Sequence, residues 1–343
     1  MELQGFSWCL IYVCLAFQVV QSTKFHNSSL THWKRHEGKI INGTEAQWEG
    51  TQYQVSVRLT SGDWLFGAGH ICGGALIAPN TVLTAAHCIW STTFNRFRNA
   101  SDYTVVMGNL NRYQQDNGTT LVFGVSKLSV HREFNATSYA NDVAILQLDG
   151  RVPVNFTRAR VIPLNHERNL NASHAVCQVS GWGRNENGVY SPQLMVVDVG
   201  IVNRTQCTVN YGALVRDGMI CAGYMEGGRD ACVGDSGGPL VCGDQLVGVV
   251  SFGVGCARPG YPGVYADVAS YVPWINNQTK SFEDVGGFGD DGVGGDDGVG
   301  DGGDDGDGPN YGGGVIGANA AGMRSCVSLL IMAFCCSLLT RVR

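Results

Sequence analysis

Three short segments carry residue types that together could activate a hydroxyl group for attack on a carbonyl. Ser236 lies in the run Gly-Asp-Ser-Gly-Gly-Pro, where small neighbours let a reacting group approach the backbone closely. A serine hydroxyl attacks poorly unless a base removes its proton and a carboxylate orients that base. His87, in Thr-Ala-Ala-His-Cys, and Asp142, in Asn-Asp-Val-Ala-Ile-Leu, could supply these groups. The sequence therefore predicts a nucleophilic serine site.

The order of these residues along the chain distinguishes between unrelated folds that use the same chemistry. Subtilisins run Asp, His, Ser, and α/β-hydrolases run Ser, Asp, His, whereas this chain runs His87, Asp142, Ser236. The three motifs resemble those of the chymotrypsin/trypsin family of serine proteases, over roughly Ile40 to Asn276. A glycine-serine turn, a core histidine and a helix-capping aspartate would explain each motif singly, but not the set.

The resemblance implies a fold and a set of roles. The fold would be all-β, with two six-stranded antiparallel β-barrels, a carboxyl-terminal helix and a catalytic cleft between the barrels. Ser236 would be the nucleophile, His87 the general base and Asp142 its orienting carboxylate. The backbone amides of Gly234 and Ser236 would form the oxyanion hole.

Substrate preference is predicted from the positions that match the family's specificity pocket. Asp230, six residues before the nucleophile, would place a carboxylate at the pocket floor and select Arg or Lys. Gly253 and Gly263 match the walls, which must be small for a long side chain to enter. Ala231, where many trypsins have Ser, removes a hydroxyl that would solvate a lysine ammonium, so Arg is favoured over Lys. Ser251 matches the serine that supports the buried aspartate.

The run Ile40-Ile-Asn-Gly resembles the amino terminus that this family creates by cleavage of a zymogen after a basic residue, here Lys39. The new ammonium group would pair with Asp235, because an unpaired buried charge is costly. The expected partners are protein or peptide substrates with Arg or Lys before the scissile bond, an activating trypsin-like protease and protein protease inhibitors.

Two other functions are alternatives to an endopeptidase tethered to a membrane. A protease-fold binding protein without catalysis is disfavoured, because the three candidate catalytic residues and the activation motif are intact. A freely secreted digestive trypsin would have no use for the unusual carboxyl-terminal segment described below. No cofactor and no metal are expected, and the composition, with 15% charged residues, carries no nucleic-acid signature.

Thirteen cysteines fall into three groups: two near the amino terminus, three near the carboxyl terminus and eight between them. Eight central cysteines suit a disulfide framework in an oxidising compartment, although spacing alone allows 105 connectivities. The family resemblance implies four pairs: Cys72 with Cys88, Cys177 with Cys242, Cys207 with Cys221, and Cys232 with Cys256.

The amino-terminal segment indicates export. Residues 1–22 contain a short apolar run and small residues at the expected cleavage point, which predicts a secretory signal peptide; a retained anchor is the alternative. Residues 23–39 would be the propeptide and residues 40–280 the protease domain. Nine Asn-x-Ser/Thr sequons fit the same route: Asn27, Asn42, Asn99, Asn117, Asn135, Asn155, Asn171, Asn203 and Asn277.

The carboxyl-terminal region differs in composition from the rest. Residues 281–312 are rich in Gly and Asp with few large apolar groups, so a disordered, self-repelling stalk is expected, a calcium-binding repeat being the rival interpretation. Residues 313–343 combine small residues with a terminal apolar run of 15, which resembles a glycosylphosphatidylinositol (GPI) attachment signal. A short single-pass anchor is the alternative. Either would display the protease on the extracellular face of the plasma membrane.

Short apolar or alternating runs separated by Gly, Asn and Pro predict strands over residues 53–59, 104–107, 143–148, 193–202 and 245–252. Only residues 268–276 are expected to be helical. His70, His131 and His174 belong to no motif and are expected to be surface or packing residues. The loop 109–116 lacks the glutamates with which trypsins bind calcium, so no calcium is expected there.

Overall fold

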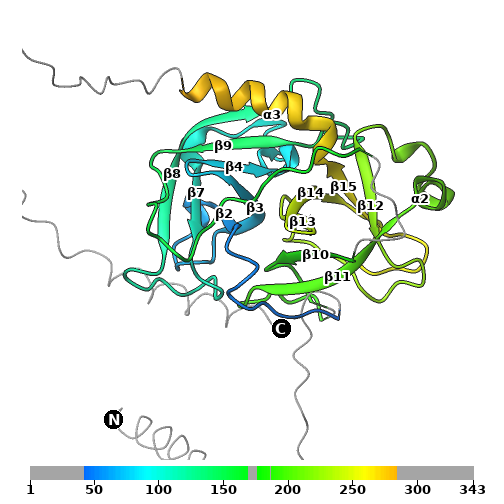
Figure 1. The fold of residues 1–343 in the computed structure, drawn as a ribbon, viewed down its shortest axis with the longest axis horizontal. Coiled ribbons are helices and arrows are strands. Elements are labelled where there is room, and N and C mark those ends of the chain that lie inside the picture. Colours follow the sequence, from blue (N-terminus) through cyan, green and yellow to red (C-terminus); the bar gives the residue numbers. More distant parts are fainter. Residues whose placement is uncertain (1–41, 169–175, 186, 284–343) are drawn as a thin grey trace, which may run out of the picture. The chain divides into compact units, whose positions relative to one another are not determined.

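The computed structural model describes residues 42–168, 176–185 and 187–283 (Figure 1). The predicted signal peptide, propeptide, stalk and anchor signal lie outside these ranges, apart from the first residues of the stalk. So do Lys39, Ile40, His174 and the sequons at Asn27 and Asn171. Within the described residues, no helix is long and apolar enough to cross a bilayer.

The first barrel is a closed, six-stranded antiparallel sheet in the order β2-β3-β4-β9-β8-β7. Val55, Val57, Leu83 and Ile145 are wholly buried inside it, which explains the apolar runs in the sequence. The strands are β2 (Gln54–Leu59), β3 (His70–Ala78), β4 (Thr81–Thr84), β7 (Tyr103–Met107), β8 (Leu121–Val130) and β9 (Ala144–Leu148).

The second barrel runs β11-β10-β13-β14-β15-β12 and is closed by pairing of β12 with the end of β11, while β1 (Thr44–Glu45) pairs with the start of β11. The two barrels lie side by side (Figure 1). This confirms the predicted all-β fold. The strands are β10 (Val176–Gly181), β11 (Met195–Val202), β12 (Met219–Gly223), β13 (Pro239–Cys242), β14 (Gln245–Phe252) and β15 (Gly263–Asp267).

Two α-helices are present in the described residues, where one was predicted. The carboxyl-terminal helix α3 (Val268–Glu283) extends seven residues beyond the expected end at Asn276 and packs Tyr271 and Ile275 onto the core of the first barrel (Figure 1). The helix α2 (Arg204–Tyr211) corrects the expectation that only residues 268–276 are helical. Its first turn is capped by Asn203, whose side chain accepts a hydrogen bond from the amide of Thr205.

The remaining elements are short. A hairpin of β5 (Trp90–Ser91) and β6 (Arg96–Phe97) follows directly after His87. Single turns of 3₁₀-helix are η1 (Thr60–Gly62), η2 (Ala86–Cys88), η3 (Ala100–Asp102) and η4 (Gly212–Leu214).

Four disulfides join the described cysteines in the pairs that the resemblance implied: Cys72–Cys88, Cys177–Cys242, Cys207–Cys221 and Cys232–Cys256. Cys232–Cys256 links the loop before Ser236 to the loop after β14. Cross-links of this kind stabilise a fold by roughly 2–4 kcal/mol each, chiefly by restricting the unfolded chain. The disulfides thus hold the loops around the candidate site as well as the barrels.

Candidate active site

His87 and Asp142 come together because the strands that precede and follow them pair. Thr84, the last residue of β4, lies opposite Ala144, the first residue of β9. His87 Nδ1 is 2.7 Å from Asp142 Oδ2, and the His87 backbone amide donates to Asp142 Oδ1 at 2.8 Å. With Nδ1–H directed at the carboxylate, Nε2 is the ring nitrogen that can accept a proton.

Asp142 is held from the second barrel as well. Ser251, on β14, donates its hydroxyl hydrogen to Asp142 Oδ2 at 2.6 Å, and the Asp142 side chain is only 1% exposed. Burial disfavours the charged form of His87, but the negative charge and hydrogen bond of Asp142 outweigh this and raise the pKa of His87 above its usual value. The carboxylate therefore fixes the ring and stabilises its cation.

Ser236 lies in the loop between Asp230 and β13 and lines the same cavity of about 310 Å³ as His87. The loop is tied to the first barrel, because the Gly73 amide donates to the Ser236 carbonyl at 2.8 Å. The structure thus brings His87, Asp142 and Ser236 to one cleft between the barrels.

Gly234 adopts a φ of 100°, a conformation that favours glycine. A Cβ at this position would lie 2.7 Å from the ring of Tyr190. Neither the Gly234 amide nor the Ser236 amide donates a hydrogen bond to another described residue. Both amides are therefore free to donate to an oxygen atom of a ligand, as the donors of an oxyanion hole must be.

The cavity extends from Ser236 to a buried carboxylate. Asp230 is 3% exposed; its Oδ2 accepts from the Ala257 amide at 2.9 Å, whereas its Oδ1 has no hydrogen-bond partner among the described residues. Burial raises the pKa of Asp230 to about 7. A buried acceptor without a partner is costly, so this carboxylate favours a ligand that brings a cationic donor.

The other residues predicted for the specificity pocket lie near Asp230. Ala231, Gly253 and Gly263 all line this cavity. A Cβ on Gly263 would lie 2.8 Å from Asp230 Oδ1, so any side chain there would cover the carboxylate. The pocket is therefore open only because this residue is glycine.

Asp235, predicted to pair with a new amino terminus, is fully buried next to Ser236. Its two oxygens accept hydrogen bonds from the amides of Gly183 and Cys232, each at 2.8 Å. Burial raises the pKa of Asp235 to about 6, although these two amides act in the opposite direction. The buried carboxylate would gain from a neighbouring cation.

Two side chains at the cleft carried no signal in the sequence. Tyr139 and Phe252 line the cavity, and the Tyr139 ring lies 5.4 Å from the rings of both His87 and Phe252. Tyr139 has a positive φ of 55°, which is unusual for a tyrosine. These rings form an apolar wall on the His87 side of the cleft.

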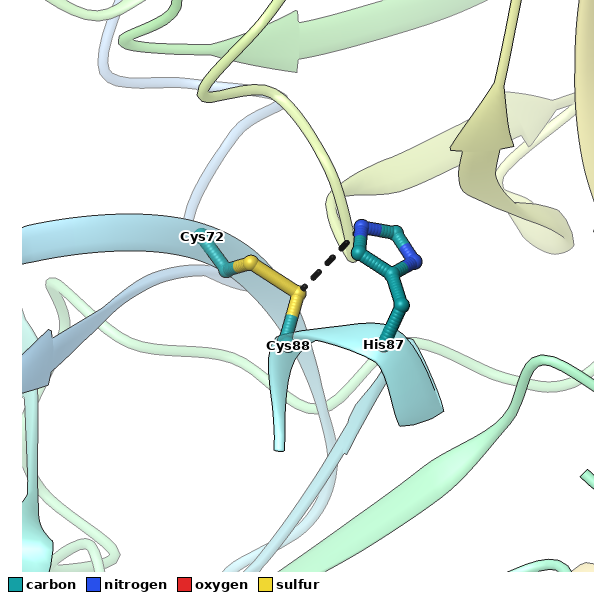
Figure 2. Close-up of side chains that lie close together, drawn as sticks. All are labelled: Cys72, His87 and Cys88. Atoms are coloured by element: carbon teal, nitrogen blue, oxygen red, sulfur yellow. Dashed lines mark hydrogen bonds between the residues drawn. A yellow bond between two sulfur atoms is a disulfide. The ribbon is translucent and has the colours of Figure 1, made fainter. Parts of the chain in front are cut away.

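Cys72, His87 and Cys88 cluster closely enough to suggest a metal site, but their chemistry does not suit one. Figure 2 shows the His87 ring beside the bonded sulfur atoms, with Nε2 4.0 Å from Cys88 Sγ. Both sulfurs belong to a disulfide, and metal binding requires thiolates. This disulfide packs against the ring instead.

The histidines expected to be surface or packing residues differ from one another. His131 is partly buried and packs against Tyr271 and Trp274. His70 is buried and specifically hydrogen bonded, to Ser56 Oγ and to the Gly234 carbonyl. His70 therefore contacts the candidate oxyanion hole, which the sequence did not indicate.

Comparison with known proteins agrees with this geometry. The family model described as Trypsin matches residues 40–275. The chain is 40% identical to Trypsin eta of Drosophila melanogaster over 249 residues, which is 72% of this chain and 90% of that protein. It is 37% identical to Trypsin Blo t 3 of Blomia tropicalis over 71% of this chain and 86% of that protein.

A vertebrate relative is similar to the same extent: Trypsin I-P1 of Gallus gallus is 36% identical over 71% of this chain and 91% of its own length. The matched region spans both barrels and the whole candidate site. The chain belongs to the trypsin family and is a serine endopeptidase.

Proposed function

We propose that this protein is an endopeptidase that cleaves after Arg or Lys, with Arg preferred, and that it is made as a zymogen. The observation that carries the specificity is the buried Asp230 carboxylate, whose Oδ1 lacks a partner in a cavity shared with His87 and Ser236. A guanidinium group offers several hydrogen-bond donors and a permanent charge, which suits such an acceptor. Ala231 provides no hydroxyl to solvate a compact ammonium, which favours Arg.

In the proposed reaction, the Ser236 hydroxyl attacks the substrate carbonyl while His87 Nε2 takes its proton. The carbonyl oxygen becomes an oxyanion, which the amides of Gly234 and Ser236 stabilise. His87 then gives the proton to the leaving amine, the peptide C–N bond breaks, and an ester to Ser236 remains. Water, activated by the same histidine, hydrolyses this ester and regenerates the hydroxyl. Asp142 keeps the imidazole tautomer and stabilises its cation throughout.

A positional peptide library tests the specificity directly. Digestion by the chain cleaved after Lys39 is expected to give products that end in Arg, and less often in Lys. Preferential hydrolysis after bulky apolar residues would contradict the proposed role of Asp230.

Activation is proposed to occur by cleavage between Lys39 and Ile40. The new ammonium would pair with Asp235, which is fully buried and already bonded to two backbone amides of the substrate-binding loops. Asn42, which follows the proposed cleavage site, donates from Nδ2 to the Gly228 carbonyl at 2.8 Å. This bond joins the segment to the loop that leads to Asp230.

Lys39→Gln is expected to block this activation. A buried carboxylate without a cation costs several kcal/mol, so activity after trypsin treatment should remain at least about a hundredfold below that of the treated wild type. The measurement is hydrolysis of an arginyl anilide, together with amino-terminal sequencing.

Lys39→Arg is the matched control and should be activated normally. Full activity of uncleaved Lys39→Gln protein would show that no activation step is needed.

We further propose that the chain passes through the secretory pathway and is glycosylated. The asparagines of all seven sequons in the described residues are exposed, as attachment of a glycan requires: Asn42, Asn99, Asn117, Asn135, Asn155, Asn203 and Asn277. The four disulfides suit an oxidising compartment. The proposed signal peptide, propeptide, acidic stalk and anchor signal rest on the composition of residues 1–39 and 281–343.

If the anchor is GPI, phosphatidylinositol-specific phospholipase C should release the protease from the surface of intact cells into the medium. Western blotting and arginyl-anilide hydrolysis of both fractions measure the release. Protein that stays on the cells after treatment would indicate a single-pass anchor, whereas protein found in the medium of untreated cells would indicate a freely secreted enzyme. Deletion of residues 323–343 is the control and should abolish surface retention.

A further inference from the structure

A buried arginine, Arg58, begins a chain of hydrogen bonds that ends at the candidate oxyanion hole. Arg58 lies on β2, and its side chain is 1% exposed. Arg58 Nε donates to Ser56 Oγ at 3.0 Å; Ser56 Oγ is 2.8 Å from His70 Nδ1; and His70 Nε2 is 3.1 Å from the Gly234 carbonyl oxygen. All three links are buried.

The donor hydrogens in this series of hydrogen bonds can be arranged in only one way. The Gly234 carbonyl can only accept, so His70 Nε2 must carry a hydrogen. His70 is buried and its pKa is lowered to about 3, mainly by burial and also by the charge of Arg112, so the ring is neutral and Nδ1 accepts. The Ser56 hydroxyl must then donate to Nδ1. Ser56 Oγ is left to accept from Arg58, which has donors only.

Arg58 itself is held firmly from its other side. Its Nη2 donates to the Arg112 carbonyl at 2.8 Å, and its Nη1 is 3.3 Å from Asp63 Oδ2. The Phe66 ring lies 4.2 Å from its guanidinium carbon. Three separate contacts therefore fix the position of the guanidinium, from which the series of hydrogen bonds to Gly234 begins.

The far end of this series of hydrogen bonds holds the peptide that joins Gly234 to Asp235, whose amide also donates to the Cys232 carbonyl at 3.0 Å. The bond from His70 fixes the Gly234 carbonyl, while the Gly234 amide has no acceptor among the described residues. The Gly234 amide belongs to the preceding peptide, whose Val233 carbonyl accepts from the Arg184 amide at 2.8 Å. Because glycine at a positive φ has more conformations open to it than other residues, the bond from His70 on its other side is needed to fix Gly234 between the two peptides.

We propose that Arg58 is a positioning residue for catalysis: through Ser56 and His70 it orients the Gly234 amide toward the developing oxyanion. This inference rests on the proposed function of the site. An oxyanion donor is useful only when it already points to where the charge will form. Arg58 does not contact substrate, so its effect falls on the transition state rather than on binding of the arginine side chain at Asp230.

The test compares two small ligands that use different parts of the cleft. A peptide aldehyde ending in argininal forms a tetrahedral adduct with Ser236 and needs the oxyanion hole, whereas benzamidine needs only the Asp230 pocket. Arg58→Met and Ser56→Ala are both expected to weaken aldehyde binding and to lower kcat by about tenfold, part of the 10²–10³ that a lost oxyanion donor costs. The benzamidine Kd and the KM should stay within about twofold.

Two further variants separate positioning from general stability. Ser56→Thr keeps the hydroxyl and should restore most of kcat. Asp63→Asn removes the ion pair of Arg58 but leaves the bonds from Nη2 to the Arg112 carbonyl and from Nε to Ser56, so kcat should fall less than in Arg58→Met. Equal losses in benzamidine and aldehyde binding, or an unchanged kcat in Ser56→Ala, would overturn the inference. A wild-type enzyme that binds neither ligand would instead contradict the proposed function.

Discussion

Ser236→Ala is expected to lower kcat of the Lys39-cleaved enzyme by about a millionfold, because removal of the nucleophile leaves only the residual catalysis of the oxyanion hole and substrate binding. KM for an arginyl peptide should change little, since the Asp230 pocket remains intact. Single-turnover hydrolysis of an arginyl anilide and labelling by a fluorophosphonate probe measure the loss. Retention of more than about 1% of the wild-type kcat would exclude Ser236 as the nucleophile.

The proposed partnership of His87 and Asp142 with Ser236 has its own signature. Groups that act as one unit are not additive, so the double variant Ser236→Ala, His87→Ala should be no slower than Ser236→Ala alone. His87 in turn contacts Asp142, its Nδ1 lying 2.7 Å from Asp142 Oδ2. A further large loss in the double variant would mean that His87 acts in a separate step.

Asp230→Ser is expected to lower kcat/KM for arginyl substrates by about 10⁴, because a site built around a buried polar group discriminates strongly when the complementary pair is broken. Asp230 is 3% exposed, and its Oδ1 has no other described partner, so no neighbouring group can replace it. The measurement is kcat/KM for matched substrates with Arg, Lys and Leu before the scissile bond. Ala231→Ser is the control: it keeps the carboxylate and should shift preference from Arg toward Lys.

The same carboxylate predicts a pH dependence for cation binding. Its pKa is raised to about 7 by burial, and a bound cation favours the ionised form. Below pH 7 the free carboxyl is protonated, so benzamidine must displace a proton and its affinity should fall by up to about tenfold per pH unit toward pH 5. Calorimetry in buffers of different ionisation enthalpy detects the proton. Affinity that is constant from pH 8 to pH 5 would contradict the proposed pairing.

The site motifs and part of the fold could be predicted, because the residues that indicate them lie in contiguous segments. Ser236 and its glycines form one uninterrupted run, and Asp230, Gly253 and Gly263, which the resemblance singled out, line one cavity with Ser236. Some barrel strands follow from alternating apolar residues, a local signal. Five of the twelve barrel strands were predicted, with bounds that differ only at the ends: β2, β7, β9, β14 and β11, which begins at Met195 rather than at residue 193. The other seven gave no such signal.

The parts that could not be predicted depend on contacts between distant segments. His70 and Gly234 are 164 residues apart, and nothing in either local sequence indicates that they touch. The helix α2 contains Thr205, Thr208 and Val209, which favour strands, so its form depends on the Asn203 cap and on the disulfide from Cys207. In α2 the disulfide and the cap outweigh the strand propensity of these residues, whereas the contact between His70 and Gly234 exists only in the folded chain.

The site is assembled across the boundary between the two barrels. His87 and Asp142 come from one barrel, Ser236 and Asp230 from the other, and three bonds join them there: Ser251 to Asp142, Gly73 to Ser236 and His70 to Gly234. A displacement of about 1 Å in reacting groups can cost a hundredfold in rate. The turnover rate of this enzyme therefore depends on how well the two barrels, each closed on itself, are aligned. Activity can be lost while each barrel stays folded.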